Sequence, residues 1–159
     1  GAAITAGYWG ALLCGRIISQ QWFGRGGGTL AILALAIAGA GVSSAVLAAS
    51  TGNIAIGAAA AFGAGLCMGP IWPSTVSIVA QESGASDATA AVVTLGNAGG
   101  LALPWAQGRV LVDAGPAEGV VVTSVLCAVM LLIVAGFAIA RRRSGAGHGA
   151  DGNVGLLPE

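Results

Sequence analysis

The sequence contains no charged side chain between Arg25 and Glu82. A soluble domain must expose part of any segment of that length to water, and charged residues make up about 25% of such domains. In this chain charged residues make up 8% of the sequence and hydrophobic residues 56%. The sequence therefore predicts an integral membrane protein.

A helix that crosses a bilayer needs about 20 mostly apolar residues. Barrel strands would instead alternate apolar and polar residues over about ten positions, and the apolar runs here are continuous and longer. We expect an all-α bundle over residues 1–143 and a Gly-rich, disordered cytoplasmic tail over 144–159. The predicted spans are about 2–23, 29–49, 54–81, 88–112 and 120–140.

The arginines predict how the chain crosses the membrane. Arg25 follows the first predicted span and Arg141–Arg143 follow the fifth, so both groups fall on the same side. Basic loops favour the cytoplasm, which places the C-terminus inside a plasma (inner) membrane. The chain begins on apolar residues without a methionine, and the first span would start outside. We therefore expect a fragment of a longer, multi-pass protein.

Several classes of function are not expected. The net charge is zero and lysine is absent, whereas nucleic-acid binding needs a basic surface. Cys14, Cys67 and Cys127 lie in apolar runs with no zinc-binding spacing, so we predict neither a metal nor a cofactor. A membrane enzyme would need clustered acids or histidines, but the single histidine lies in the tail. The lipid bilayer is the one partner that composition alone implies.

The most informative stretch is Gly63–Gln81 in the third predicted span. Pro70 and Pro73 each remove a backbone donor and predict a kink. Trp72 lies between them, and three hydroxyl residues follow: Ser74, Thr75 and Ser77. These hydroxyls either satisfy the carbonyls that the prolines leave free or line a wet cavity. We favour the cavity, with Trp72 offering its ring to a ligand.

Two further spans carry polar residues. Arg16 is a functional candidate because ionisable residues in a membrane are costly, and the alternative is an arginine that extends to the interface. Asn97 either binds a neighbouring helix or hydrogen-bonds a polar solute. Pro104 and Trp105 predict a second kink and a second aromatic surface.

The other two spans are poor in polar residues. Residues 29–49 and 120–140 therefore predict peripheral helices that face lipid. Small residues recur at intervals of four, a spacing that lets helix backbones approach closely. These are Gly57, Ala61, Gly65 and Gly69, and again Gly96 and Gly100.

Four segments together resemble the C-terminal half of a major facilitator superfamily transporter. Residues Gly7–Arg16 with Gly24 and Arg25 are similar to its eighth helix and the following cytoplasmic loop. Gly65–Pro73 is similar to the tenth helix, most closely in the fucose-permease-like sugar branch. The eleventh and twelfth helices are matched by Leu95–Trp105 with Gly108-Arg109, and by the last span with Arg141–Arg143. The loop motif departs from the family at Gln21 and Trp22, where an acidic residue and an arginine are usual.

The resemblance implies a partial six-helix bundle that lacks its first helix and the N-terminal half of the transporter. It implies a secondary active transporter that moves a small polar solute, such as a sugar, by alternating access. The alternatives are a drug or metabolite exporter of the same superfamily and a non-transporting structural membrane subunit. Our candidates for the solute cavity are Arg16, Trp72, Thr75, Asn97 and Trp105.

Overall fold

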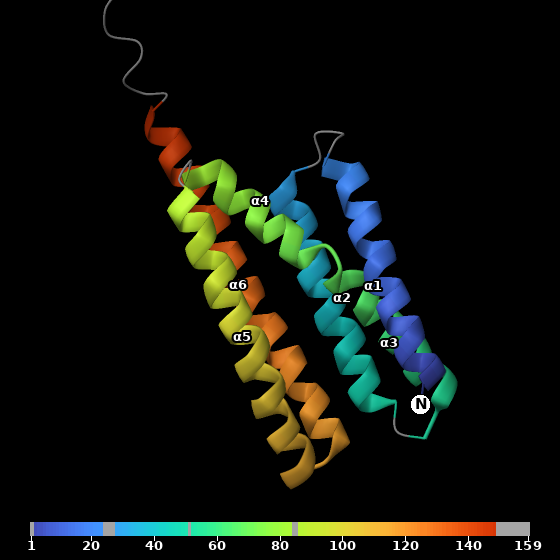
Figure 1. Ribbon diagram of the computed structural model, residues 1–159. Coiled ribbons are helices and arrows are strands. Elements are labelled where there is room, and N and C mark those ends of the chain that lie inside the picture. The colour runs from blue at the N-terminus through green and yellow to red at the C-terminus, as the bar shows by residue number, and fades with distance from the viewer. Residues whose placement is uncertain (1, 24–27, 51, 84–85, 149–159) are drawn as a thin grey trace, which may run out of the picture.

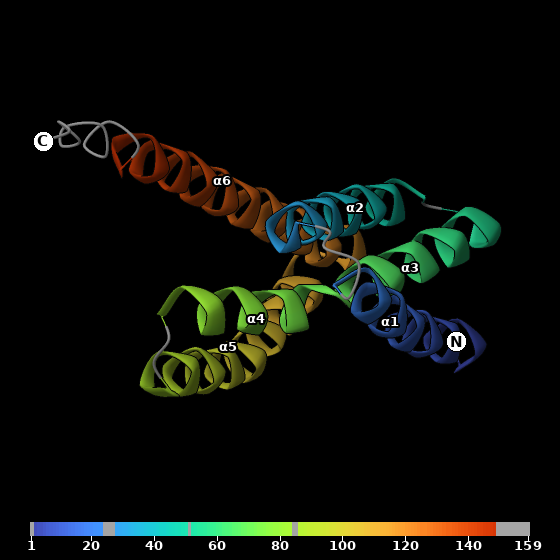
Figure 2. The same ribbon diagram turned by 90° about the horizontal axis from the view of Figure 1, so that it is seen from above.

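The computed structural model describes residues 2–23, 28–50, 52–83 and 86–148. Within these ranges the chain is helical and contains no strand, which confirms the all-α prediction. The helices are α1 (Ala2–Phe23), α2 (Thr29–Ala49), α3 (Ile54–Met68), α4 (Ile71–Ser83), α5 (Ser86–Asp113) and α6 (Pro116–His148). In Figures 1 and 2, α1 with α3 and α5 with α6 lie on opposite sides of the molecule, with α2 between them.

Three helical stretches in the described part of the chain are long and apolar enough to cross a membrane. They are Thr29–Ala49, Ile54–Glu82 and Pro116–Arg143. The first and third correspond to α2 and α6, and the second combines α3 and α4. Although α1 and α5 have 22 and 28 residues, they carry polar side chains and fall outside this group. That α1 and α5 also cross a membrane stays a prediction.

The third predicted span is interrupted at Gly69-Pro70. Helix α3 ends at Met68 and α4 begins at Ile71, so the kink predicted at Pro70 is a break between two helices. Pro70 has no N–H to donate to the preceding turn, which explains why the helix stops here. By contrast, α5 continues through Pro104 from Ser86 to Asp113 without a break. A bend at Pro104 stays a prediction.

Helix ends follow local signals in the sequence. The Asn53 side chain caps α3, because its Oδ1 accepts hydrogen bonds from the backbone N–H groups of Ala55 (3.1 Å) and Ile56 (3.2 Å). Gly115 adopts a φ of 123°, which glycine tolerates, and this turn starts α6 at Pro116 rather than at residue 120.

Helix α6 also extends further than expected at its C-terminal end. It continues to His148, so residues 144–148 are helical and do not begin the predicted disordered tail. Three consecutive arginines, which are good helix formers, carry the helix past residue 140. Residues 149–159 of the predicted tail lie outside the described residues.

Helix α2 is central, which corrects the prediction that it is a peripheral helix. It packs against α3, α4 and α6, and the core consists of Leu33, Ile37 and Ala40 with Cys127. Small residues allow contact on more than one face. A Cβ at Gly39 would lie 2.6 Å from the Cys67 sulfur, and one at Gly41 would lie 3.1 Å from the Cys127 Cβ. A polar-poor helix can thus face other helices instead of lipid.

Two of the four small residues with this spacing, Gly65 in α3 and Gly69 directly after it, pack closely on a neighbouring helix, as predicted. A Cβ at Gly65 would overlap the Tyr8 carbonyl, and one at Gly69 would overlap the Leu12 carbonyl, both on α1. From the other side, a Cβ at Gly15 would overlap the Leu66 carbonyl. The two backbones are therefore in direct contact. The predicted pair Gly96 and Gly100 behaves differently, because only Gly96 is in close contact with another residue. Gly96 contacts Trp72, whereas Gly100 has open space around its Cα.

Candidate functional site

The indole of Trp72 lies against α5 at Gly96. A Cβ at Gly96 would lie 2.6 Å from the indole Cη2, so the ring rests directly on the glycine backbone. Trp72 still exposes 40% of its surface, and the adjacent Asn97 is also exposed. Trp72 therefore packs on the residue that precedes Asn97, where α4 meets α5. That the two side chains line one cavity stays a prediction.

Thr75 borders a different space. It lies close to Trp72 on α4, but it lines an apolar cavity of about 350 Å³ between α2, α4 and α6. Its hydroxyl donates to the Ile71 carbonyl oxygen at 2.8 Å, within its own helix. The structure places Thr75 beside Leu33 and Ile133 on the inner side of α4, whereas Trp72 contacts α5. Its contact with a solute stays a prediction.

The hydroxyls after the prolines bond within α4. Ser74 is fully buried, and its Oγ donates to the Pro70 carbonyl at 2.6 Å. The same carbonyl accepts the Ser74 N–H at 3.0 Å. The carbonyls that Pro70 and Pro73 leave free belong instead to residues four positions earlier, Leu66 and Gly69. Ser74 and Thr75 therefore stabilise the first turns of α4 and do not bond to those two carbonyls.

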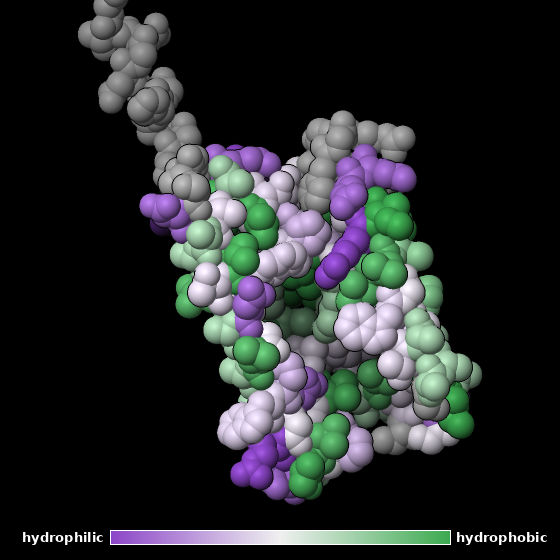
Figure 3. Space-filling model, in the orientation of Figure 1, coloured by the Kyte–Doolittle hydropathy of each residue, from purple (hydrophilic) through white to green (hydrophobic). Residues whose placement is uncertain are grey.

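Arg16 lies on α1, on the other side of the molecule from α5 (Figures 1 and 2). Its side chain is exposed, and no ion pair involves it in the described part of the chain. Figure 3 shows the surface hollowed between the sides formed by α5 and α1, with hydrophilic side chains on both borders. The Arg16 backbone lies beside Gly69, three residues before Trp72, because a Cβ at Gly69 would lie 2.9 Å from the Arg16 nitrogen. That Arg16 shares a solute cavity with Trp72 and Asn97 stays a prediction.

Trp105 lies further along α5 and exposes 69% of its surface. The Arg109 guanidinium carbon is 5.9 Å from the centre of its ring, within the range of a cation–π contact. Trp105 is thus an exposed aromatic surface, as predicted, with a cation one turn away. The predicted cytoplasmic loop motif, Gly24 and Arg25, lies outside the described residues.

One interhelical contact was not predicted from the sequence. The Gln107 side-chain amide on α5 donates to the Gly119 carbonyl oxygen and to the Thr123 hydroxyl on α6, both at 2.9 Å. A glutamine in one apolar helix and a threonine in the next are the only sequence signals for this bond. Their pairing depends on the α5–α6 turn, which the sequence does not specify in detail.

A second such contact joins the ends of α4 and α6. The Nε of Arg141 lies 3.2 Å from a carboxylate oxygen of Glu82.

Among the described residues, no three histidine, cysteine or acidic side chains gather as metal ligands would.

Comparisons of the chain with protein-family profiles, with curated proteins and with solved structures gave no match.

Proposed function

We propose that this chain is a fragment of a secondary active transporter of the major facilitator type, namely its C-terminal half without the first helix of that half. The transporter moves a small polar solute across the plasma membrane by alternating access. A second helical bundle supplies the other half of the solute cavity, and the Arg141–Arg143 end of α6 lies in the cytoplasm. The observation that carries this proposal is the exposed Trp72 indole packed on Gly96, the residue that precedes the exposed Asn97.

An amide in a membrane helix needs a hydrogen-bonding partner, because lipid offers none. The Asn97 side chain makes no hydrogen bond to any other described residue, and it is exposed in the middle of α5. Its partner must therefore come from outside this bundle. A water-filled cavity with a polar solute supplies one, and lipid does not.

The neighbouring side chains suit a solute with both apolar and polar faces. Ligand sites are lined mainly by apolar and aromatic groups, with a few polar groups that fix orientation. Trp72 provides a flat apolar ring, and Asn97 provides two donors and an acceptor. A sugar ring, which has apolar C–H faces and hydroxyl edges, matches this combination.

Solute uptake by the full-length protein tests the proposal. Liposomes containing the purified protein are assayed for uptake of radiolabelled hexoses, including L-fucose, under a proton gradient. We expect saturable uptake that Asn97→Ala lowers about tenfold or more, because a polar solute loses a hydrogen bond in a desolvated site. Val125→Ala, at an exposed position on α6, is the matched control and leaves uptake unchanged.

The same preparation separates the alternatives. An exporter would expel ethidium and take up no hexose, and the large exposed surface of Trp105 favours this alternative over other transporter types. A structural subunit would transport neither probe. Wild-type uptake by both Asn97→Ala and Arg16→Ala would contradict the proposed site even if the protein is a transporter.

A further inference from the structure

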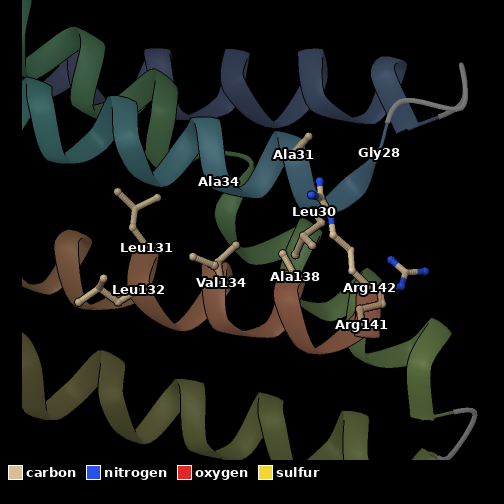
Figure 4. A pocket seen from close by; sticks show the side chains of 11 residues that line it. Gly28, Leu30, Ala31, Ala34, Leu131, Leu132, Val134, Ala138, Arg141 and Arg142 are labelled. Carbon is tan, nitrogen blue, oxygen red and sulfur yellow. The ribbon is translucent and has the colours of Figure 1, made fainter. Parts of the chain in front are cut away.

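A long groove lies between α2 and α6 on a side of the bundle away from Trp72 and Asn97. Its volume is about 810 Å³. Its walls are apolar, with Leu30, Ala31 and Ala34 from α2 facing Leu131, Val134 and Ala138 from α6. Figure 4 shows these side chains along the two helices and two arginines, Arg141 and Arg142, at the end near Gly28.

The shape of the groove follows from where small residues lie. Toward Gly41 the two helices are in close contact, since a Cβ there would lie 3.1 Å from the Cys127 Cβ. Toward Gly28 the alanines at 31, 34 and 138 are too short to fill the space between the helices. The result is an elongated apolar groove that begins beside the tightly packed core and ends at the two arginines.

The two arginines differ in their partners. Arg141 pairs with Glu82 at 3.2 Å, and its side chain is 63% exposed. Arg142 makes no ion pair with any described residue. A guanidinium presents a planar set of donors that matches a phosphate group. One end of the groove therefore carries a cation without a counterion, and the apolar walls of the groove suit a hydrocarbon chain.

We propose that this groove binds an anionic phospholipid, with an acyl chain along α2 and α6 and the phosphate at Arg142. A soluble anion would gain nothing from the apolar walls, and a zwitterionic phospholipid would bring its own cation next to Arg141 and Arg142. The groove is also open along α6, where its lining residue Leu132 is 74% exposed. Basic pockets between membrane helices on the cytoplasmic side are suited to anionic headgroups. The proposal depends on α2 and α6 crossing a membrane and is independent of any transport activity.

Native mass spectrometry of the full-length protein in detergent, titrated with phosphatidylglycerol or phosphatidylcholine, tests the proposal. We expect Arg142→Ala to weaken phosphatidylglycerol binding about fivefold. Arg143→Ala removes the same charge outside the groove lining, and we expect less than about a twofold change, because an exposed guanidinium that makes no direct bond to the phosphate contributes little. Ala34→Leu fills the groove, leaves all arginines in place and should also weaken phosphatidylglycerol binding.

Each other outcome overturns the proposal. Equal losses in Arg142→Ala and Arg143→Ala would indicate attraction to a diffuse positive surface. Equal binding of phosphatidylcholine would remove the role of the anionic headgroup. Unchanged binding in Ala34→Leu would place the acyl chain elsewhere, and competition by glycerol phosphate would indicate a site for free phosphates. Circular dichroism of each variant verifies that the helices remain folded.

Discussion

Trp72 of α4 packs on Gly96 of α5 so closely that a side chain at position 96 would displace the indole ring. This contact joins α5 to α4, which itself packs against the core through Ile71 and Ile78. Because the glycine has no side chain, the indole ring lies against the α5 backbone and stays partly exposed, next in sequence to the exposed Asn97. The candidate site and the packing of α4 on α5 therefore depend on the same residue.

Gly96→Ala should destabilise the bundle by about 1–3 kcal/mol, the usual cost of overpacking. The new Cβ would lie 2.6 Å from Cη2 of Trp72, so the indole must move. Unfolding in mixed detergent micelles, followed by circular dichroism, measures the free energy. Gly100→Ala, with open space around its Cα, should be neutral or stabilising by up to about 1 kcal/mol.

The same substitution in a Trp72→Ala background provides a direct check. With the ring removed, Gly96→Ala should cost much less, and the coupling between the two changes gives the energy of the contact. A full loss of stability in that background would show that something other than the indole crowds position 96.

Gly15→Ala should separate α1 from α3. Its Cβ would overlap the Leu66 carbonyl, which is backbone and cannot move aside as a flexible side chain does. We expect a loss of at least about 1–3 kcal/mol in the free energy of unfolding. Gly10→Ala lies on the same helix with nothing within 4 Å, and it should keep wild-type stability. Equal effects of the two substitutions would contradict the close contact between these backbones.

Gln107→Leu should weaken the α5–α6 pair by about 0.6–2 kcal/mol, the range for hydrogen bonds between membrane helices. The substitution keeps the volume but removes both 2.9 Å bonds to α6. Thr94→Val serves as the control, because the Thr94 hydroxyl bonds only to the Ala90 carbonyl of its own helix. A double-mutant cycle with Thr123→Val isolates the side-chain bond, and zero coupling would show that the two side chains do not interact.

Glu82→Gln should change stability by only about 0–1 kcal/mol. Both partners of the Glu82–Arg141 pair are well exposed, at 41% and 63% of their side-chain surfaces, so water screens the attraction. Thermal unfolding in detergent at low and high salt provides the measurement. The small difference between wild type and variant should shrink as salt rises. A large, salt-independent loss would mean that the pair is shielded from water in the micelle.

The sequence by itself determined where the helices lie. Apolar runs satisfy their own backbone as helices, and loop residues such as Asn53 and Gly115 fix where they begin and end. The bounds 2–23 and 29–49 were predicted correctly, and the two prolines predicted the disruption at Gly69-Pro70. Of the candidate site, the sequence identified Trp72, Asn97 and Trp105 as unusual side chains for a membrane helix, because aromatic and amide groups stand out among alanine, glycine and leucine.

Only the tertiary structure decided which faces of these helices meet. A polar-poor helix has the same sequence character whether it faces lipid or other helices, because lipid is as apolar as a leucine side chain. For that reason α2 was predicted to be peripheral and is instead central. For the same reason the sequence did not predict the inward position of Thr75, the hydrogen bond from Gln107 to α6, or the groove that ends at Arg142. In this chain the packing depends on where the glycines lie, because a residue without a side chain lets two helix backbones come into contact. Which glycines make such contacts is seen only in the folded structure.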